Sequence, residues 1–441
     1  MIKIGLEIHV SLNTNSKLFC KCSTKGDVNE NVCEVCLGYP GSRLCLNENA
    51  LVKCLKIAKA LNCNLSEELI FSRKSYFYPD LSKNYQVSML RPLGLDGYVD
   101  VDGKNIGITQ VHLEEDPASS TRAQGYSLLD YSRSGAPLAE IVTKPDISSA
   151  KEAREFMKTL LTILKYIDVF DLDGIIKADV NVSIKKNEYT RVEVKNVTGF
   201  KDIQRVIEHE IKRQEKEGAV LETRGWDSIV GKTYSMRKKE SSLDYGYIYE
   251  PDIPVIKNNF EIELPQMPIE KINKYTSLKI TLENAKIISE DPLVANLFDK
   301  IILVNDPVFS SLFFRTHLLS VLQDKSLKDT KISSNNLNDL IKLFYEKQIN
   351  KLGMEVILNE LLIKDIDVNA FAKSKGLIQI KDESVLEDYA KEAISENPSA
   401  VNDYSLGEGK ALNFLVGKVM QKSKGKANPG KVAQLIKKLL D

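Results

Sequence analysis

Acidic side chains gather in residues 107–146 and are the first candidates for chemistry. Glu114, Glu115 and Asp116 are consecutive, and Glu140 follows in the next strand-like run. Clustered carboxylates repel one another, so a fold that brings them together usually supplies a cation, a proton or a basic partner. Mg²⁺ is the obvious candidate, because it prefers oxygen ligands and bridges carboxylates to phosphates. The alternative is a solvated acidic turn.

Four cysteines form a second candidate site in two close pairs. Cys20 and Cys22 make the first pair, and Cys33 and Cys36 make the second after a short loop. This spacing predicts a tetrahedral zinc site, in which four thiolates leave no open position for catalysis. Zinc would therefore be structural and would tie down the loop of residues 18–41, which has little hydrophobic content of its own. The alternative is four free thiols.

A third group of polar side chains lies on segments that alternate as β-strands do. Residues 2–12 place Glu7 and His9 on one face and apolar side chains on the other. Residues 176–184 and 191–195 alternate in the same way, and the polar turn between them predicts a hairpin. The polar face of this hairpin carries Lys177, Asp179, Asn181, Arg191, Glu193 and Lys195. Such a mixture suits a metal with phosphate, and a ladder of cross-strand salt bridges is the alternative.

The composition limits the class of protein. The chain has 441 residues, of which 43% are hydrophobic and 28% charged, so it is long enough for two or three domains and typical of a globular protein. Its formal net charge of +0 gives no overall attraction to nucleic acid, and any RNA contact requires a local basic patch. The sequence shows no secretory leader and no apolar run that spans a bilayer. We therefore expect a reducing cytoplasm and no membrane contact.

Helical periodicity and proline indicate the domain organisation. Prolines crowd the stretch that ends at residue 268, which predicts a domain boundary there. Residues 269–374 and 375–441 beyond it predict two helical units. Three amphipathic helices are predicted before the boundary, at residues 48–61, 152–167 and 200–214.

Basic residues stand in two places that suit RNA. Residues 73–86 interleave aromatic and basic side chains, which can stack bases or grip a phosphate, although aromatic packing under a loop is the alternative. From Glu408 to the last residue, eight lysines stand against two acids. This local charge suits an RNA backbone, and a solvated helix face is equally compatible with it.

Over nearly its whole length the chain resembles the GatB family, the B subunits of tRNA-dependent amidotransferases. The resemblance rests on the order of the segments GLEIHVSL, VCEVCLGYPG, FSRKSYFYPDL, GITQVHLEED, YSRSGAPLAEIVTKPD, ADVNVSI, EVKNVTGF, ETRGWD and KGKANP. It implies a cytoplasmic heterotrimer with an amidase-type A subunit, which hydrolyses glutamine, and a small C subunit. The B subunit would use ATP and Mg²⁺ to phosphorylate the side-chain carboxylate of Glu-tRNA(Gln) or Asp-tRNA(Asn), and ammonia would displace the phosphate.

The resemblance also implies the roles of individual residues. The metal and phosphate site would comprise Glu7, His9, Glu114, Glu140, Asp179, Asn181, Glu193 and Lys195. Glu115 is also a candidate magnesium ligand, because the motif does not distinguish it from Glu114. The cofactor-binding candidates are Arg133, Lys177 and Arg191. The structural zinc would be held by Cys20, Cys22, Cys33 and Cys36, which match the ligands of family members that have them.

The implied fold is α+β. An antiparallel-sheet cradle similar to glutamine synthetase would occupy residues 1–268, followed by an all-α domain (269–374) and a helical tail that binds tRNA (375–441). The chain departs from the family pattern at residues 117–119, which read Pro-Ala-Ser in place of Ala-Gly-Lys, and at residues 243–247, which read Leu-Asp-Tyr-Gly-Tyr in place of His-Asp-Tyr-Arg-Tyr. Three charged side chains are thus missing. The alternative is therefore a divergent, non-catalytic subunit that binds tRNA or serves as a scaffold.

Overall fold

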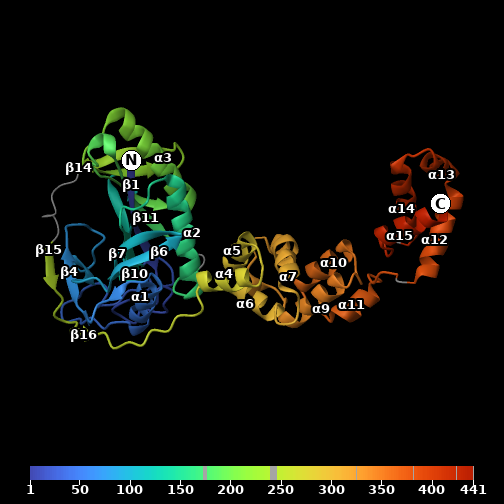
Figure 1. Cartoon of the computed structure of the whole chain (residues 1–441). Helices are drawn as coiled ribbons and strands as arrows, with labels where there is room; N and C mark the ends of the chain where they lie inside the picture. Colours follow the sequence, from blue (N-terminus) through green and yellow to red (C-terminus); the bar gives the residue numbers. More distant parts are fainter. Residues whose placement is uncertain (172–175, 239–245, 324, 381, 424, 441) are drawn as a thin grey trace. The chain divides into compact units, whose positions relative to one another are not determined.

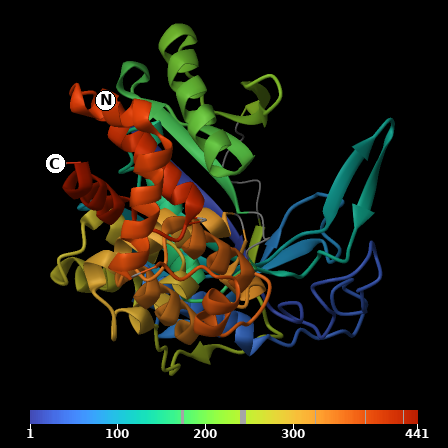
Figure 2. The same cartoon turned by 90° about the vertical axis from the view of Figure 1, so that its right-hand side faces the viewer.

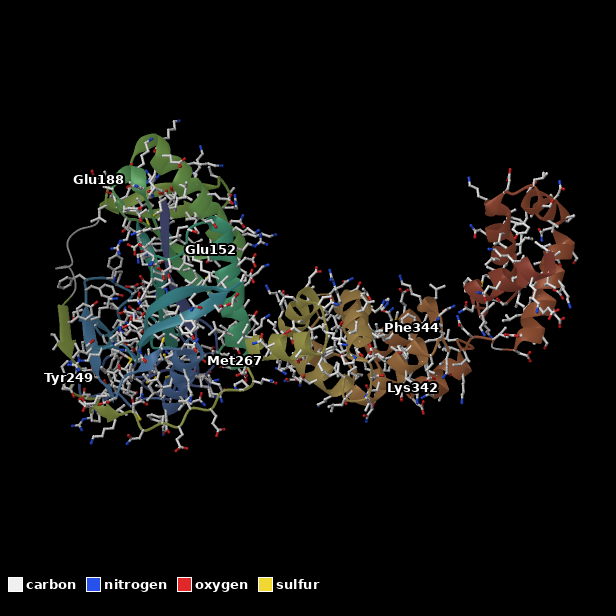
Figure 3. All side chains as sticks on the ribbon, viewed as in Figure 1. Glu152, Glu188, Tyr249, Met267, Lys342 and Phe344 are labelled. Atoms are coloured by element: carbon white, nitrogen blue, oxygen red, sulfur yellow. The ribbon has the colours of Figure 1, made fainter. Side chains whose placement is uncertain are left out.

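The structure, a computed structural model, describes residues 1–171, 176–238, 246–323, 325–380, 382–423 and 425–440. It divides into two compact units, Met1–Met267 and Pro268–Asp441 (Figure 1). Met267, the last residue of the first unit, is labelled in Figure 3. No helix in the described ranges is long and apolar enough to cross a lipid bilayer. Residues 243–245, where the sequence departs from the family pattern, lie outside these ranges.

A nine-stranded sheet is the frame of the first unit. In spatial order its strands are β14 (Lys232–Lys238), β13 (Glu222–Asp227), β12 (Val192–Thr198), β11 (Lys177–Ile184), β1 (Ile2–Ser11), β10 (Pro137–Thr143), β7 (Lys104–Glu115), β6 (Gly94–Val101) and β2 (Asn64–Leu65). All neighbours pair antiparallel except β12 and β13, which are parallel. The first strand of the sequence therefore lies in the interior of the sheet.

The sheet has one apolar face, which three helices cover. Along β1, Ile4, Leu6 and Ile8 are at most 1% exposed, whereas Glu7 and His9 alternate with them onto the other face. The apolar side chains share one core with α1 (Glu48–Ala60), α2 (Ala150–Tyr166) and α3 (Phe200–Glu217), which lie against the sheet in Figure 1. The polar face of the sheet is consequently left for chemistry.

Local capping explains where α2 begins. The Ser149 hydroxyl accepts a hydrogen bond from the Glu152 backbone N–H at 3.1 Å, and the Glu152 carboxylate accepts one from the Ser148 N–H at 2.7 Å. The first bond satisfies a donor that the first helical turn leaves unpaired, and the second fixes the residue that precedes the N-cap. Together they tie the start of α2, where Figure 3 labels Glu152, to the end of the segment that carries β10.

Three smaller sheets complete the first unit. They are β15 (Gly246–Tyr249) with β4 (Phe71–Ser75) and β5 (Tyr85–Met89), β16 (Ile256–Lys257) with β3 (Glu68–Leu69), and β8 (Ser119–Ala123) with β9 (Tyr126–Asp130). The β8–β9 ribbon projects from the unit beside the loop that carries the cysteines (Figure 2). Asn29 of that loop donates its backbone N–H to the Asp130 carboxylate at 3.0 Å, so ribbon and loop are joined.

The second unit is helical in the described ranges. Its α-helices are α4 (Pro268–Ser277), α5 (Leu282–Ser289), α6 (Pro292–Ile301), α7 (Pro307–Phe313), α8 (Leu319–Leu322), α9 (Ser334–Tyr345), α10 (Lys351–Leu361), α11 (Val368–Ser374), α12 (Glu383–Glu396), α13 (Pro398–Ser405), α14 (Gly409–Lys422) and α15 (Pro429–Leu440). A π-helical turn, Phe314–Leu318, joins α7 to α8. The buried residues form two cores, one between Tyr275 and Ala372 and one between Leu386 and Ile436.

The coarse fold predicted from the sequence is confirmed. The protein is mixed α/β, with a large and mostly antiparallel sheet followed by helices. The predicted hairpin is β11 and β12, which pair antiparallel around a short 3₁₀ turn, Lys185–Asn187. The similarity to glutamine synthetase stays a prediction.

Candidate functional site

The polar face of the sheet gathers residues from five strands, which come from separate parts of the sequence except for the β11–β12 hairpin. Cross-strand pairing sets Glu7 opposite Asp179, and His9 opposite both Glu140 and Lys177. Residues that face one another across antiparallel strands on the same side are within contact distance. The register thus assembles the site from β1, β10 and β11, and β7 and β12 extend it on either side.

Two overlapping groups on this face can each hold a metal ion. One is Glu7, His9 and Glu140, and the other is Glu7, Asp179 and Glu193. Within each group one ligand atom per residue lies within 4.8 Å of the others. Carboxylate oxygens with one imidazole suit a hard divalent cation such as Mg²⁺ or Mn²⁺. The residues present therefore fit the magnesium ion that the sequence predicts.

An unpaired acceptor adds to this fit. Within the described part of the chain, the buried Asn181 side-chain oxygen has no hydrogen-bond donor. Asn181 lies on β11 opposite Glu193, on the same face as Asp179. Buried acceptors are normally satisfied, so such an atom indicates that a cation or a ligand donor belongs at this face.

In the second of the two groups, the carboxylates of Asp179 and Glu193 form ion pairs with a lysine. Lys195 Nζ lies 2.5 Å from Asp179 Oδ2 and 2.9 Å from Glu193 Oε1. The two carboxylate side chains are 3% and 7% exposed, whereas that of Lys195 is 32% exposed. Burial alone would lower the pKa of Lys195, but the surrounding Asp179, Glu193 and Glu7 raise it strongly, so the side chain is an ammonium ion.

The pKa values of Glu7 and Glu140 are shifted in opposite directions. Burial, together with the charges of Glu140 and Asp179, raises the pKa of Glu7. Burial also opposes ionisation of Glu140, but His112, His9 and Lys74 outweigh it and hold its pKa below the usual value. Glu140 is consequently the anion of the group, and Glu7 is the member that holds a proton more readily.

Glu114 belongs to the same cluster from β7. Burial is the main cause that raises its pKa to about 7, and the charge of Glu140 acts in the same direction. Its side chain shares the face of His112, two residues earlier in the strand, while Glu115 alternates to the opposite side. Strand alternation therefore places Glu114 and Glu115 on opposite sides of β7, although the sequence motif did not distinguish them.

Glu115 makes contacts away from the acidic cluster. Its carboxylate accepts hydrogen bonds from Lys83 Nζ at 2.7 Å and from the Val87 backbone N–H at 2.8 Å. The side chains of Lys83 and Glu115 are each 4% exposed, so this is a buried ion pair. The geometry does not support the prediction that Glu115 is a magnesium ligand, because its oxygen atoms are engaged on the other side of β7.

The cofactor-binding candidates are not brought together. Arg133 makes a two-pronged contact with Asp116, with nitrogen–oxygen distances of 2.6 and 2.7 Å, and this engages its guanidinium outside the cluster. Lys177 lies on the polar face opposite His9. Arg191 is exposed and precedes the first residue of β12.

Two residues near the cluster were not among the predicted site residues. His112 Nδ1 lies 3.9 Å from Glu140 Oε2, and the pairing of β7 with β10 sets the two residues opposite each other. Lys74 of β4 lowers the pKa values of Glu114 and Glu140 through its charge. Its only signal in the sequence is the basic and aromatic segment that contains it.

The four cysteines form a separate candidate metal centre. One sulfur atom from each of Cys20, Cys22, Cys33 and Cys36 lies within 4.8 Å of the others. A tetrahedral thiolate site with Zn–S bonds of about 2.3 Å requires such a cluster. The donor set is therefore the one that structural zinc takes.

Hydrogen bonds prepare one of these sulfurs as a thiolate. Cys36 Sγ accepts hydrogen bonds from the Cys33 backbone N–H at 3.2 Å and from the buried Lys17 Nζ at 3.5 Å. Chiefly because Cys20 donates to it, and with help from Cys33 and Lys17, the pKa of Cys36 falls to about 4 although burial opposes this. The pKa of Cys20 is raised by donating to Cys36 and by burial. The group thus already holds negative charge for a cation.

Comparison with known proteins decides the family. The profile of the GatB/GatE catalytic domain matches residues 2–262, and the profile of the GatB domain matches residues 296–440. The chain belongs to the GatB family. The catalytic-domain match of this GatB chain spans the whole nine-stranded sheet, the acidic face and the cysteine cluster.

Curated relatives match this GatB chain from end to end. It is 37% identical over 470 residues to the second aspartyl/glutamyl-tRNA(Asn/Gln) amidotransferase B subunit of Clostridium acetobutylicum, with 99% of this chain and 98% of the relative covered. It is 39% identical over 477 residues to the B subunit of the same name from Thermotoga maritima, and 38% identical over 471 residues to that of Clostridium beijerinckii, with the same coverage.

Proposed function

We propose that this chain is the B subunit of a tRNA-dependent amidotransferase, a glutamine-hydrolysing carbon–nitrogen ligase. It activates the side-chain carboxylate of Glu-tRNA(Gln), of Asp-tRNA(Asn), or of both, with ATP, for amidation by ammonia from an amidase partner. The observation that carries the proposal is the acidic face, where Glu7, His9 and Glu140 lie within 4.8 Å. Full-length relatives named as B subunits of aspartyl/glutamyl-tRNA(Asn/Gln) amidotransferases support it.

The chemistry explains why an acidic face suits this reaction. A carboxylate oxygen is a poor leaving group until it is phosphorylated, and phosphoryl transfer depends mainly on positioning and on neutralising charge. Glu7, His9 and Glu140 would hold Mg²⁺, with Glu114 beside them. When bound, the ion neutralises and aligns phosphate oxygens.

One of the chain's own cations, Lys195, lies beside this position. Lys195 is held by Asp179 and Glu193, so its ammonium group faces the shared carboxylate Glu7 with fixed geometry. Lys177 and Arg191 remain the candidates that would contact the triphosphate. Arg133, which is bound to Asp116, is better assigned to ordering the loop before β10 than to nucleotide contact.

We also propose that the four-cysteine cluster holds structural Zn²⁺. The loop that carries it would gain its folding energy from the metal, since metal binding and folding are coupled in such small sites. The ion would also order the β8–β9 ribbon, because Asn29 joins the loop to Asp130.

The proposed partners and location follow from the same assignment. The chain would assemble in the cytoplasm with an amidase-type A subunit and a small C subunit, as a heterotrimer. The described helices of residues 375–440, with their lysines, would contact the tRNA backbone. Lys424 of this basic stretch lies outside the described residues.

The test is an amidation assay on the assembled complex. The chain is purified with its A and C partners, and ATP-dependent conversion of Glu-tRNA(Gln) and of Asp-tRNA(Asn) is followed for the wild type and Glu140→Gln. We expect the substitution to reduce turnover by about 10²-fold or more, as removal of a group that stabilises transition-state charge does. Glu188→Gln, at an exposed turn position labelled in Figure 3, is the matched control and should leave turnover unchanged.

Two further readouts separate the explanations. Glutaminase activity of the complex should survive Glu140→Gln, which shows that the assembly is intact, whereas hydroxylamine trapping of the acyl phosphate should fail. Unchanged amidation in Glu140→Gln would remove this residue from the mechanism. Intact tRNA binding with no ATP turnover in the wild type would favour the non-catalytic scaffold.

A further inference from the structure

The acidic face offers two adjacent cation positions that share one ligand. Glu7 belongs to the group with His9 and Glu140 and also to the group with Asp179 and Glu193. Two metal ions bridged by a carboxylate are common in phosphoryl-transfer sites, at separations of about 3.5–4 Å. The ligand set alone would therefore suggest a two-metal centre.

Lys195 occupies the second of these positions. Its Nζ is bound to both Asp179 and Glu193, two of the three carboxylates of that group. An ammonium at 2.5 and 2.9 Å from these oxygens leaves no room for an Mg²⁺ ion, whose ligands must lie at about 2.0–2.1 Å. Lysine and metal are therefore mutually exclusive there.

Regular alternation along β12 already sets Lys195 on the face of Glu193, and a backbone irregularity follows it. The pairing of β11 with β12 shifts between Ala178 and Val180, so that Asp179 faces two residues, Lys195 and Asn196. Asn196 has φ 55° and donates its backbone N–H to Asp179 Oδ1 at 2.7 Å. Such a bulge redirects side chains and is typical of functional sites. It holds Asp179 between the ammonium and a backbone donor.

We propose that Lys195 is a built-in cation that takes the place of a second divalent metal, so that the site binds one metal ion, at Glu7, His9 and Glu140. This deepens the proposed function and rests on it. The built-in ammonium offsets one of the two negative charges of Asp179 and Glu193 before any nucleotide arrives. Nζ has three N–H donors, and within the described residues two are accounted for by these carboxylates, which leaves one to contact a phosphate oxygen of the substrate.

The experiment counts metal ions, independently of activity. The full chain, with its cysteines loaded with zinc beforehand, is titrated with Mn²⁺ by calorimetry and electron paramagnetic resonance. The wild type should bind about one Mn²⁺ with an uncoupled signal, and Lys195→Met should bind about two with the spin coupling of neighbouring ions. Lys195→Arg, which keeps a cation, and Lys177→Met, which removes another lysine of the same face, should each bind about one.

The number of bound ions distinguishes failure of the built-in cation from failure of the proposed metal site. Two coupled ions in the wild type, or one ion in both the wild type and Lys195→Met, overturn the built-in cation and leave the proposed function standing. No Mn²⁺ bound by the wild type overturns the metal site of the proposed function itself. If Lys195→Met is unstable without metal, the inference still requires that Mn²⁺ raise its melting temperature more than that of the wild type, and an equal rise refutes it.

Discussion

The buried Glu114 gives a pH dependence of stability that can be worked out from the structure. The pKa of its carboxyl is raised from 4.5 to about 7, mainly by burial. The folded protein therefore keeps this proton at pH values where the unfolded chain has lost it, so folding is favoured at low pH. This contribution is fully present below pH 4.5 and is lost as the pH rises toward 7. At about 1.36 kcal/mol per pKa unit, the loss is about 3 kcal/mol.

The assay is urea unfolding of the metal-free chain between pH 4.5 and pH 8. The single tryptophan, Trp226, lies on β13 and reports unfolding of the first unit. Glu114→Gln cannot ionise, so its stability should fall less with pH than that of the wild type, by about 3 kcal/mol across this window. Comparing the two proteins cancels the groups that titrate in both.

Glu188→Gln is the control, because Glu188 is exposed and lies at a turn away from the acidic face. Its stability profile should be parallel to that of the wild type. Parallel profiles for the wild type and Glu114→Gln would refute the reasoning, since they would mean that burial does not hold a proton on this residue. Addition of Mg²⁺ should reduce the wild-type slope, because metal binding selects the ionised carboxylate.

Two further substitutions, each with its own control variant, test the cysteine loop and the buried ion pair of Lys83 with Glu115. Cys33→Ser should lower the zinc content of the purified chain from about one ion to none by elemental analysis, while Cys45→Ser leaves it unchanged; equal content in both would discard the site. Lys83→Met should destabilise the first unit by about 3–5 kcal/mol in urea unfolding, because it leaves Glu115 charged and buried. Lys144→Met breaks an exposed pair and should cost under about 1 kcal/mol; similar losses in the two lysine variants would contradict the buried pair.

Strand alternation was the most informative signal in the sequence. Because side chains alternate with a period of two, it placed Glu7 with His9, and Asp179 with Asn181, before any pairing was known. The spacing of the cysteines similarly predicted that they would lie together, since their two pairs are close in sequence. Local patterns thus identified the sides of the strands that carry chemistry.

The contacts between segments distant in sequence could not be predicted from the sequence. The pairing of Arg133 with Asp116 depends on a loop whose conformation no short pattern specifies. Lys74 approaches the cluster from a separate small sheet, and the sequence contains no signal for how that sheet packs on β7. The bulge at Asn196 likewise breaks the alternation that made the rest predictable.

The interior position of β1 has a consequence for synthesis of the protein. This strand is made before both of its partners, β10 (Pro137–Thr143) and β11 (Lys177–Ile184). While the ribosome adds the intervening segments, Ile4, Leu6 and Ile8 have no permanent neighbours and can associate with other chains. The strand that contributes Glu7 and His9 therefore has no sheet partner until β10 has been made.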